Sequence, residues 1–235
     1  MLDQSLKTKI ELIGQARTVN AKLQSTPGVR KLPSPHLDIY VVPDFLDEAD
    51  RLEIVSRSDR TLLPSSVLGE FPDPDYRTSR SGNLDPHDPF TKGIDDRIAQ
   101  LLGLDPKLGE TIQGQRYDVG QQFKGHMDYF HTTMAYWEAQ RIIGGQRSWT
   151  AMVFLVEPEA GGATFFPDID VKVAPRAGTL LPWNNMDANG EPNEKSKHQG
   201  RPVEAGTKYI ITKWFRERPW GVWFDPLNPT RTVWS

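Results

Sequence analysis

The sequence predicts a mainly β protein with supporting helices. Apolar residues recur at helical spacing in several segments before residue 106, whereas short apolar runs separated by turn signals follow it. The number and length of these runs favour an antiparallel barrel or a two-sheet roll over alternating βαβ units.

Residues 2–24 predict an amphipathic helix that packs on the main body. Its apolar stripe comprises Leu2, Leu6, Ile10, Ile13 and, more loosely, Leu23. A contact between two copies of the chain is an alternative use of this stripe.

Two further helices are expected in the first half of the chain. The segment DEADRLEIVSRS predicts one helix, capped by Asp44 or Asp47, after a strand in LDIYVVPDF. FTKGIDDRIAQLLGL predicts another, amphipathic through Ile94, Ile98, Leu101 and Leu102. Between them, residues 61–92 are irregular and rich in Pro, Asp, Ser and Gly, and a loop this long is typically functional or disordered.

Six segments are the strand candidates: TIQGQRYDV, SWTAMVFLVE, ATFF, VKVAP, GTLLPW and TKYIITKWFRE. The polar stretch NNMDANGEPNEKSKH is interpreted as a loop, with only a faint resemblance to a calcium loop. In the aromatic C-terminal segment, Trp220, Trp223 and Phe224 are expected to be buried as a cap on the roll.

Composition excludes several classes of function. The formal net charge is −3, which argues against a basic nucleic-acid-binding face. The local Arg clusters at 57–60 and 77–80 are interpreted as solvated surface. Cysteine is absent, so disulfides, thiolate metal sites and Cys nucleophiles are excluded. Neither a secretory signal nor an apolar run of membrane-spanning length is found, and a cytoplasmic location with no membrane partner is expected.

The His126-Met127-Asp128 motif, followed far downstream by His198, predicts a metal site. Residues two apart on an extended segment project to the same side, so His126 and Asp128 can act together. Two histidines and one carboxylate on one face of a metal are typical of non-haem Fe(II) oxygenases. A catalytic zinc hydrolase can also use three ligands, so ligand number leaves that class open.

Three other histidines are less suitable ligands. His36-Leu37-Asp38 repeats the motif, but His36 is flanked by proline and opens an apolar run, which indicates a structural role. His131 has a spacing from His126 that loosely resembles helical zinc sites, yet the intervening residues lack a helical pattern. His87 is expected to be a solvated loop residue.

Lys208 lies within an apolar strand, GTKYIITKW, where an unpaired ammonium group is costly to bury. Strand alternation places Lys208, Ile210 and Thr212 on one face. A dicarboxylate co-substrate would supply the anion that a buried lysine needs, whereas a lysine with a buried stem and a solvated amine is the alternative.

Together, RYDVGQQFKGHMD, IGGQRSWTAMVFL, GGATFFP, His198 and Lys208 resemble the 2-oxoglutarate/Fe(II)-dependent prolyl 4-hydroxylases over about residues 36–218. The resemblance implies a double-stranded β-helix (jelly-roll) core supported by N-terminal helices. It implies one domain over 1–235, with helical support and a long loop in 1–105, the catalytic core in 106–218 and a cap in 219–235.

The resemblance also implies the cofactors and the roles of residues. Fe(II) would be bound by His126, Asp128 and His198, with O2 and 2-oxoglutarate as co-substrates. Support by a reductant such as ascorbate is compatible with the resemblance, but the sequence leaves the requirement for ascorbate open. Lys208 and Tyr117 would bind the distal carboxylate of 2-oxoglutarate, and Thr179 would line its pocket. Arg147 and Trp214 would contact a proline-containing peptide or protein.

The implied reaction is hydroxylation of peptidyl proline at C4, with release of succinate and CO2. Phe123 and Arg216 depart from the tyrosine and histidine common at these positions, and both are expected to face the peptide. The 61–92 loop is a candidate to close over that peptide. The same chemistry on a free amino acid or small molecule stays an alternative, as does a non-catalytic metal-binding module for Pro-rich peptides.

Overall fold

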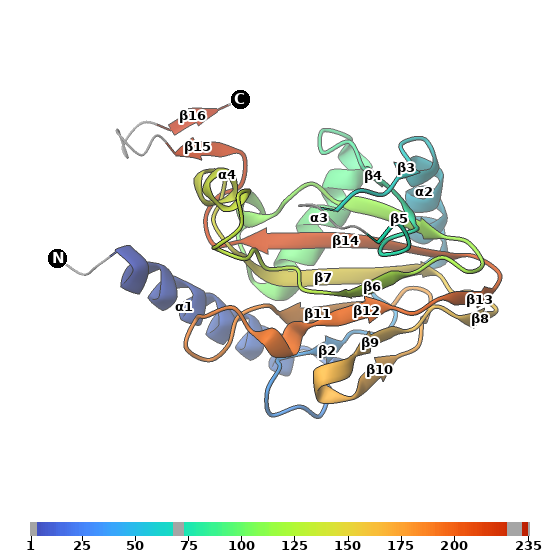
Figure 1. Ribbon diagram of the computed structural model, residues 1–235, viewed down its shortest axis with the longest axis horizontal. Helices are drawn as coiled ribbons and strands as arrows, with labels where there is room; N and C mark the ends of the chain where they lie inside the picture. The colour runs from blue at the N-terminus through green and yellow to red at the C-terminus, as the bar shows by residue number, and fades with distance from the viewer. Residues whose placement is uncertain (1–3, 68–72, 225–231, 235) are drawn as a thin grey trace.

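The computed structural model describes residues 4–67, 73–224 and 232–234, and its centre is formed by two facing β-sheets (Figure 1). The larger sheet has the order β11 (Leu180–Asn184), β7 (Arg147–Val156), β14 (Lys208–Arg216), β5 (Gln113–Tyr117), β4 (Arg80–Asn83), β3 (Leu63–Pro64). The smaller has the order β10 (Val171–Val173), β9 (Thr164–Phe166), β12 (His198–Gly200), β6 (Phe123–His126). Strand pairs in both sheets are antiparallel, which confirms a mainly β jelly-roll fold without closure into a barrel.

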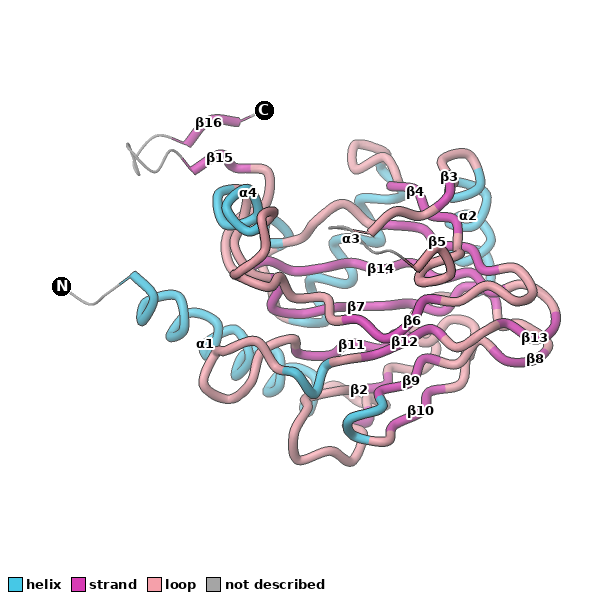
Figure 2. Tube along the Cα trace, in the orientation of Figure 1, coloured by secondary structure: helices cyan, strands magenta, loops and turns pink. Residues whose placement is uncertain are grey.

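Short pairings complete the strand framework, as the tube in Figure 2 makes visible. They join β1 (Arg30–Lys31) to β2 (Tyr40–Val41), β8 (Ala160–Gly161) to β13 (Val203–Ala205), and β15 (Val222–Phe224) to β16 (Thr232–Trp234). Single 3-10 turns occur at Pro106–Leu108, Pro167–Ile169 and Glu194–Ser196.

The α-helices are α1 (Gln4–Ser25), α2 (Glu48–Asp59), α3 (Pro89–Leu102) and α4 (Trp137–Ile142). Asp47, one of the two expected caps, begins α2 by accepting a hydrogen bond from the Asp50 backbone N–H. Asp88 caps α3 in the same way. None of the described helices has the length and apolar composition that a membrane span requires.

Helices α1, α2 and α3 cover the outer face of the larger sheet (Figure 1). Alternate residues of β14, Tyr209, Ile211 and Phe215, pack into the core between sheet and helices. Their neighbours turn to the other face, where Ile210 packs between the two sheets with Phe154 and Trp183. This alternation leaves Lys208 and Thr212 on the inner face, as predicted.

The six predicted strands are confirmed, but other expectations need correction. The stripe predicted for α1 is only partly right. Leu23 is buried as predicted, but Leu6 and Ile10 are 44% and 52% exposed, and the buried Leu12 and Val19 lie outside the stripe. Leu2 lies outside the described residues. Residues 61–92 are not a continuous loop, since β3 and β4 extend the larger sheet.

Two other differences concern the end of the molecule that carries α4. This helix was not predicted, because Trp137–Ile142 is short and has no side-chain cap. Trp220 is 36% exposed, not buried, because it lies at the rim of a cavity. The side chains of Trp223 and Phe224 lie outside the described part of the structure.

Candidate active site and metal centre

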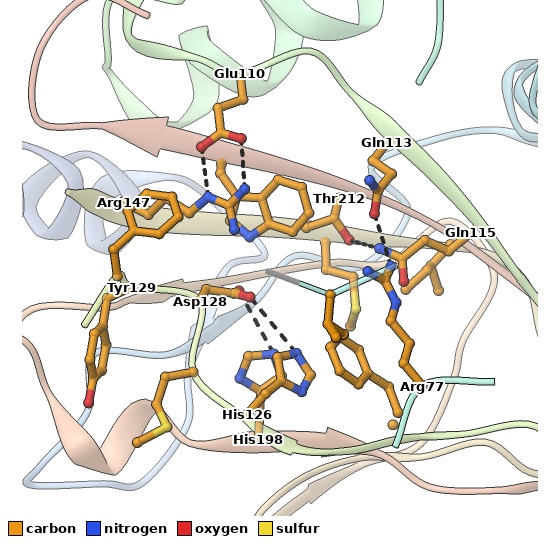
Figure 3. A pocket seen from close by; sticks show the side chains of 18 of the residues that line it. Arg77, Glu110, Gln113, Gln115, His126, Asp128, Tyr129, Arg147, His198 and Thr212 are labelled. Carbon is orange, nitrogen blue, oxygen red and sulfur yellow. Dashed lines mark hydrogen bonds and ion pairs between the residues drawn. The ribbon is translucent and has the colours of Figure 1, made fainter. Parts of the chain in front are cut away.

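The proposed metal ligands meet at one point between the sheets. His126 ends β6 and lies directly opposite His198, the first residue of β12, in the antiparallel register. Asp128 follows two residues after His126, and its carboxylate oxygens lie 3.9 Å from His126 Nε2 and 3.8 Å from His198 Nε2. The three candidate ligand atoms lie within 4.8 Å of one another. Figure 3 shows the three side chains turned toward one point.

The two imidazoles are held by matching backbone contacts. Nδ1 of His126 lies 2.9 Å from the Lys124 carbonyl, and Nδ1 of His198 lies 2.9 Å from the Ser196 carbonyl. A carbonyl can only accept, so each Nδ1 carries the proton and each Nε2 presents its lone pair. This is the arrangement that orients histidine ligands of a metal.

Asp128 is linked to the larger sheet. Thr150 on β7 donates a hydrogen bond to Asp128 Oδ2 at 2.7 Å, and the Thr150 hydroxyl accepts one from Asn185 at 2.8 Å. Burial alone would raise the pKa of Asp128, but the charges of His198, His126 and Arg147, with the Thr150 hydrogen bond, lower it. Burial and the neighbouring His198 lower the pKa of His126 to about 3.

A buried carboxylate that faces the Nε2 atoms of two histidines fits a divalent cation. At neutral pH Asp128 is anionic and His126 is uncharged, so these two side chains offer one negative charge to a cation. Because no further His, Asp, Glu or Cys in the described ranges joins the group, coordination positions remain for other ligands. The exposed His36, His87 and His131 are not brought to this point.

Lys208 is buried, with 2% of its surface exposed, on the inner face of the larger sheet. Its Nζ donates to the Gly162 carbonyl at 2.8 Å and lies 5.2 Å from the centre of the Tyr117 ring. Burial lowers the pKa of Lys208 to about 7. No carboxylate within the described ranges lies within 4.0 Å of its amine, so the site offers a cation to a ligand.

Tyr117 pairs directly with Lys208 between β5 and β14, and its hydroxyl donates to Gln115 Oε1 at 2.8 Å. Burial raises the pKa of Tyr117, so the phenol stays protonated and able to donate. Gln115 in turn donates to Thr212 on β14 at 3.1 Å.

One cavity of about 600 Å³ is lined by the His126–Asp128–His198 group and by Lys208 and Tyr117. Arg147 and Trp214, predicted to contact the peptide, also line it. Thr179 does not, which corrects its predicted place. It instead lines a second pocket between the segments that carry Arg30 and Val171.

Arg147 is held rigidly at one side of this cavity. It makes a bidentate salt bridge to Glu110 at 2.7 and 2.8 Å and stacks 4.0 Å from the Trp214 ring. Arg216 also binds Glu110, at 2.8 Å, from a fully buried position outside the cavity. The prediction that Arg216 faces the peptide is therefore wrong, because the β-bulge before Arg216 turns it into the Glu110 cluster.

On the other side, the ring of Phe123 stacks on His126 with centroids 3.5 Å apart. The guanidinium of Arg77 lies 4.7 Å from the centre of the same Phe123 ring. Sequence reasoning missed Arg77, which it placed in a solvated basic strip, and it also missed Glu110 and Gln115. The sequence offered little to identify these two residues as part of the site. Glu110 is a polar residue just before a predicted strand, and Gln115 is a polar residue within that strand.

Comparisons with known proteins agree with this geometry. Residues 112–216 match the profile of the 2OG-Fe(II) oxygenase superfamily. The alpha-1 subunit of mouse prolyl 4-hydroxylase is 34% identical over 182 residues, which cover 74% of this chain and 34% of the relative. A probable prolyl 4-hydroxylase 4 of Arabidopsis thaliana is 31% identical over 201 residues, covering 74% of this chain and 66% of that protein. The chain thus spans about a third of the length of the animal relatives.

Solved structures support the fold. The viral collagen prolyl hydroxylase of Paramecium bursaria Chlorella virus-1, in its complex with 2OG, superimposes with a TM-score of 0.61 at 23% identity, covering 76% of this chain and 95% of that one. Three comparisons thus agree: the family profile, which covers the candidate metal ligands, the curated relatives and the fold. The chain belongs to the 2-oxoglutarate/Fe(II)-dependent oxygenase superfamily, and prolyl 4-hydroxylases are among its relatives.

Proposed function

We propose that this protein is a 2-oxoglutarate- and Fe(II)-dependent dioxygenase that hydroxylates C4 of proline in a peptide. The observation that carries the proposal is one cavity that holds both an open three-ligand group and a buried lysine without a carboxylate partner in the described ranges. A zinc hydrolase has no need of the lysine, whereas a dicarboxylate co-substrate needs both features.

In this proposal Fe(II) is held by His126, Asp128 and His198, and the bound metal with 2-oxoglutarate supplies the oxidising chemistry that side chains lack. One atom of O2 enters the new hydroxyl group and the other enters succinate, while CO2 leaves from 2-oxoglutarate. The Lys124 and Ser196 carbonyls keep the histidine lone pairs directed at the metal, and Thr150 holds the carboxylate.

Lys208 binds the distal carboxylate of 2-oxoglutarate. The amine keeps its bond to Gly162 and has two further protons to donate. The Tyr117 hydroxyl can give the same carboxylate a second hydrogen bond by releasing Gln115. The walls around Lys208, which include Phe154, exclude water and so strengthen this ion pair.

The peptide is proposed to lie along the side of the cavity formed by Arg147 and Trp214. Glu110 and Trp214 fix the Arg147 guanidinium, so little side-chain entropy is lost when it donates to a peptide carbonyl. One solved neighbour, a prolyl hydroxylase from Trichoplax adhaerens, is in complex with a peptide fragment, and a peptide substrate is proposed here by analogy.

The test is succinate formation from 2-oxoglutarate by the full chain with Fe(II), ascorbate and air, with and without a Pro-rich peptide. Peptide-stimulated succinate and a gain of one oxygen atom by mass spectrometry support the proposal. His126→Ala should abolish both, because one of three metal ligands is lost. His36→Ala, which changes an exposed histidine outside the group, is the matched control. Wild-type-like turnover by His126→Ala would refute the assigned metal site.

A further inference from the structure

The charged side chains that line the cavity are unequal in number. Four are cationic and two are anionic, namely Arg77, Arg147, Lys197 and Lys208 against Glu110 and Asp128. The excess of two positive charges is notable because the whole chain carries a net charge of −3. Like charges that line one cavity repel each other, so the excess requires an explanation.

The proposed cofactor and co-substrate do not remove the excess. Fe(II) brings two positive charges and 2-oxoglutarate brings two negative ones, so together they leave the balance unchanged. Glu110 is already engaged by the Arg147 guanidinium, and Asp128 faces the metal position. Lys208 is proposed to hold the co-substrate. Arg77 and Lys197 are then the cavity cations without an assigned anion.

Arg77 is partly satisfied by neutral groups only. Its Nη1 donates to the Ser66 carbonyl at 2.8 Å and its Nη2 donates to Gln113 Oε1 at 3.1 Å. Its Nε–H is buried and has no acceptor among the described residues. No carboxylate of the described ranges lies within 4.0 Å of this guanidinium. Each Nη carries a second N–H that these two bonds do not use, and a guanidinium is suited to binding a carboxylate.

The position of Arg77 places such a carboxylate beside the reaction site. The guanidinium stacks on Phe123, which stacks on His126, so one aromatic ring separates it from a proposed iron ligand. Figure 3 shows the Arg77 guanidinium beside Gln113, apart from Arg147 and its partner Glu110.

Lys197 adds a second cation from the smaller sheet. It directly precedes His198, and its Cε lies 3.1 Å from the position that a Cβ on Gly125 would occupy. Its side chain thus packs over Gly125, the residue before His126. No carboxylate partner for its amine is found in the described ranges.

We infer that the substrate carries a carboxylate close to the carbon that is hydroxylated, and that Arg77 binds this carboxylate with support from Lys197. The inference rests on the proposed function and specifies its substrate class. The carboxylate can come from an acidic side chain next to the proline or from a chain that ends at the proline.

The test uses three short peptides that each contain one proline. In the first, Glu flanks the proline on both sides and both ends are blocked. In the second, Gln replaces Glu. The third is the Gln peptide shortened to end at the proline with a free carboxylate. Peptide binding is measured by calorimetry to the full chain loaded with Fe(II) and 2-oxoglutarate without oxygen, and succinate formation is measured separately in air.

The wild-type protein should bind the Glu peptide or the free-carboxylate peptide at least about tenfold more tightly than the blocked Gln peptide. Whichever of the two is preferred identifies the source of the carboxylate. Arg77→Gln should remove most of this preference, and Lys197→Gln should reduce it. Arg80→Gln is the matched control, because Arg80 is exposed on β4 and does not line the cavity.

Equal binding of all three peptides by the wild-type protein, or binding of none, would overturn the inference. Hydroxylation of the Gln peptide in that case would leave the proposed function intact. Preferential binding of a carboxylate peptide without any product would instead preserve the inference and refute the proposed function. If Arg77→Gln does not fold, Lys197→Gln decides the point, and an unchanged preference in that variant would count against the assignment.

Discussion

The properties of Lys208 follow from its surroundings and not from its own chemistry. An ordinary lysine is fully charged at neutral pH, but burial among Tyr117 and Phe154 lowers the pKa of Lys208 to about 7. In the ligand-free protein the amine is charged below about pH 7 and mostly neutral above it. A bound carboxylate favours the charged form, so binding and protonation of Lys208 are linked.

This linkage predicts a pH dependence of 2-oxoglutarate binding. Above pH 7 the amine must take up a proton when the dianion binds, so the apparent Kd should rise by up to about tenfold per pH unit between pH 7 and 9. Lys208→Arg, which stays charged, should show a nearly flat profile. Calorimetric titration with Fe(II) present and oxygen absent provides the measurement. Equal slopes in both proteins would exclude Lys208 as the titrating group.

Glu110 has a different role, because it neutralises two buried arginines. Burial alone would raise its pKa, but Arg147 and Arg216 outweigh this and lower it, so the carboxylate stays ionised. The Arg147–Glu110–Arg216 cluster therefore orders the side of the cavity that Arg147 lines.

Glu110→Gln should destabilise the protein by about 3–5 kcal/mol, because two buried guanidinium groups lose their counter-ion. Urea unfolding followed by tryptophan fluorescence measures the change. Glu138→Gln, which removes an exposed partner of Arg141, should change stability by less than about 1 kcal/mol. A similar loss of unfolding free energy in both variants would show that the buried cluster contributes no more to stability than an exposed ion pair.

At the scale of elements, β14 and α1 differ in how well their sequence predicts their packing. β14 lies between two covered faces, and its strict alternation separates Lys208 and Ile210 from Tyr209 and Ile211. A strand has only two faces, so the pattern determines which residues share one. In α1 many overlapping stripes are compatible with the sequence, and the buried one is set by the contact with α3.

The observed face of α1 can be tested by paired substitutions. Leu23→Ala should cost about 2–5 kcal/mol of unfolding free energy, because Leu23 is fully buried against the helical core. Leu6→Ala should change it by less than about 0.5 kcal/mol, because Leu6 is largely exposed. Chemical denaturation of both variants measures the difference, and a reversed order would mean that the helix packs through Leu6 and not through Leu23.

For the whole molecule, the metal site joins the two sheets. His126 and His198 come from the smaller sheet, whereas Asp128 is hydrogen-bonded to Thr150 on the larger one. A metal bound to all three therefore connects both layers, and its binding free energy adds to folding stability.

We expect a divalent cation to raise the melting temperature by roughly 5–10 °C when its concentration is about a hundredfold above its Kd. Mn(II) serves as an oxygen-stable probe in differential scanning calorimetry. His198→Ala should remove the increase, whereas His36→Ala should retain it. The same increase in His198→Ala would show that the cation binds elsewhere.

The sequence by itself determined the fold class, six of the strands in the two sheets, and His126, Asp128, His198 and Lys208 as candidate site residues. Strand alternation is a local rule, and the choice of candidates follows from the ligand chemistry of the residue types. The tertiary structure alone decided that Arg77 and Glu110 enter the cavity wall, that Thr179 and Arg216 stay out of it, and which face of α1 is buried. These depend on which surfaces meet across sheets and helices that are distant in the chain, and no local pattern contains that information.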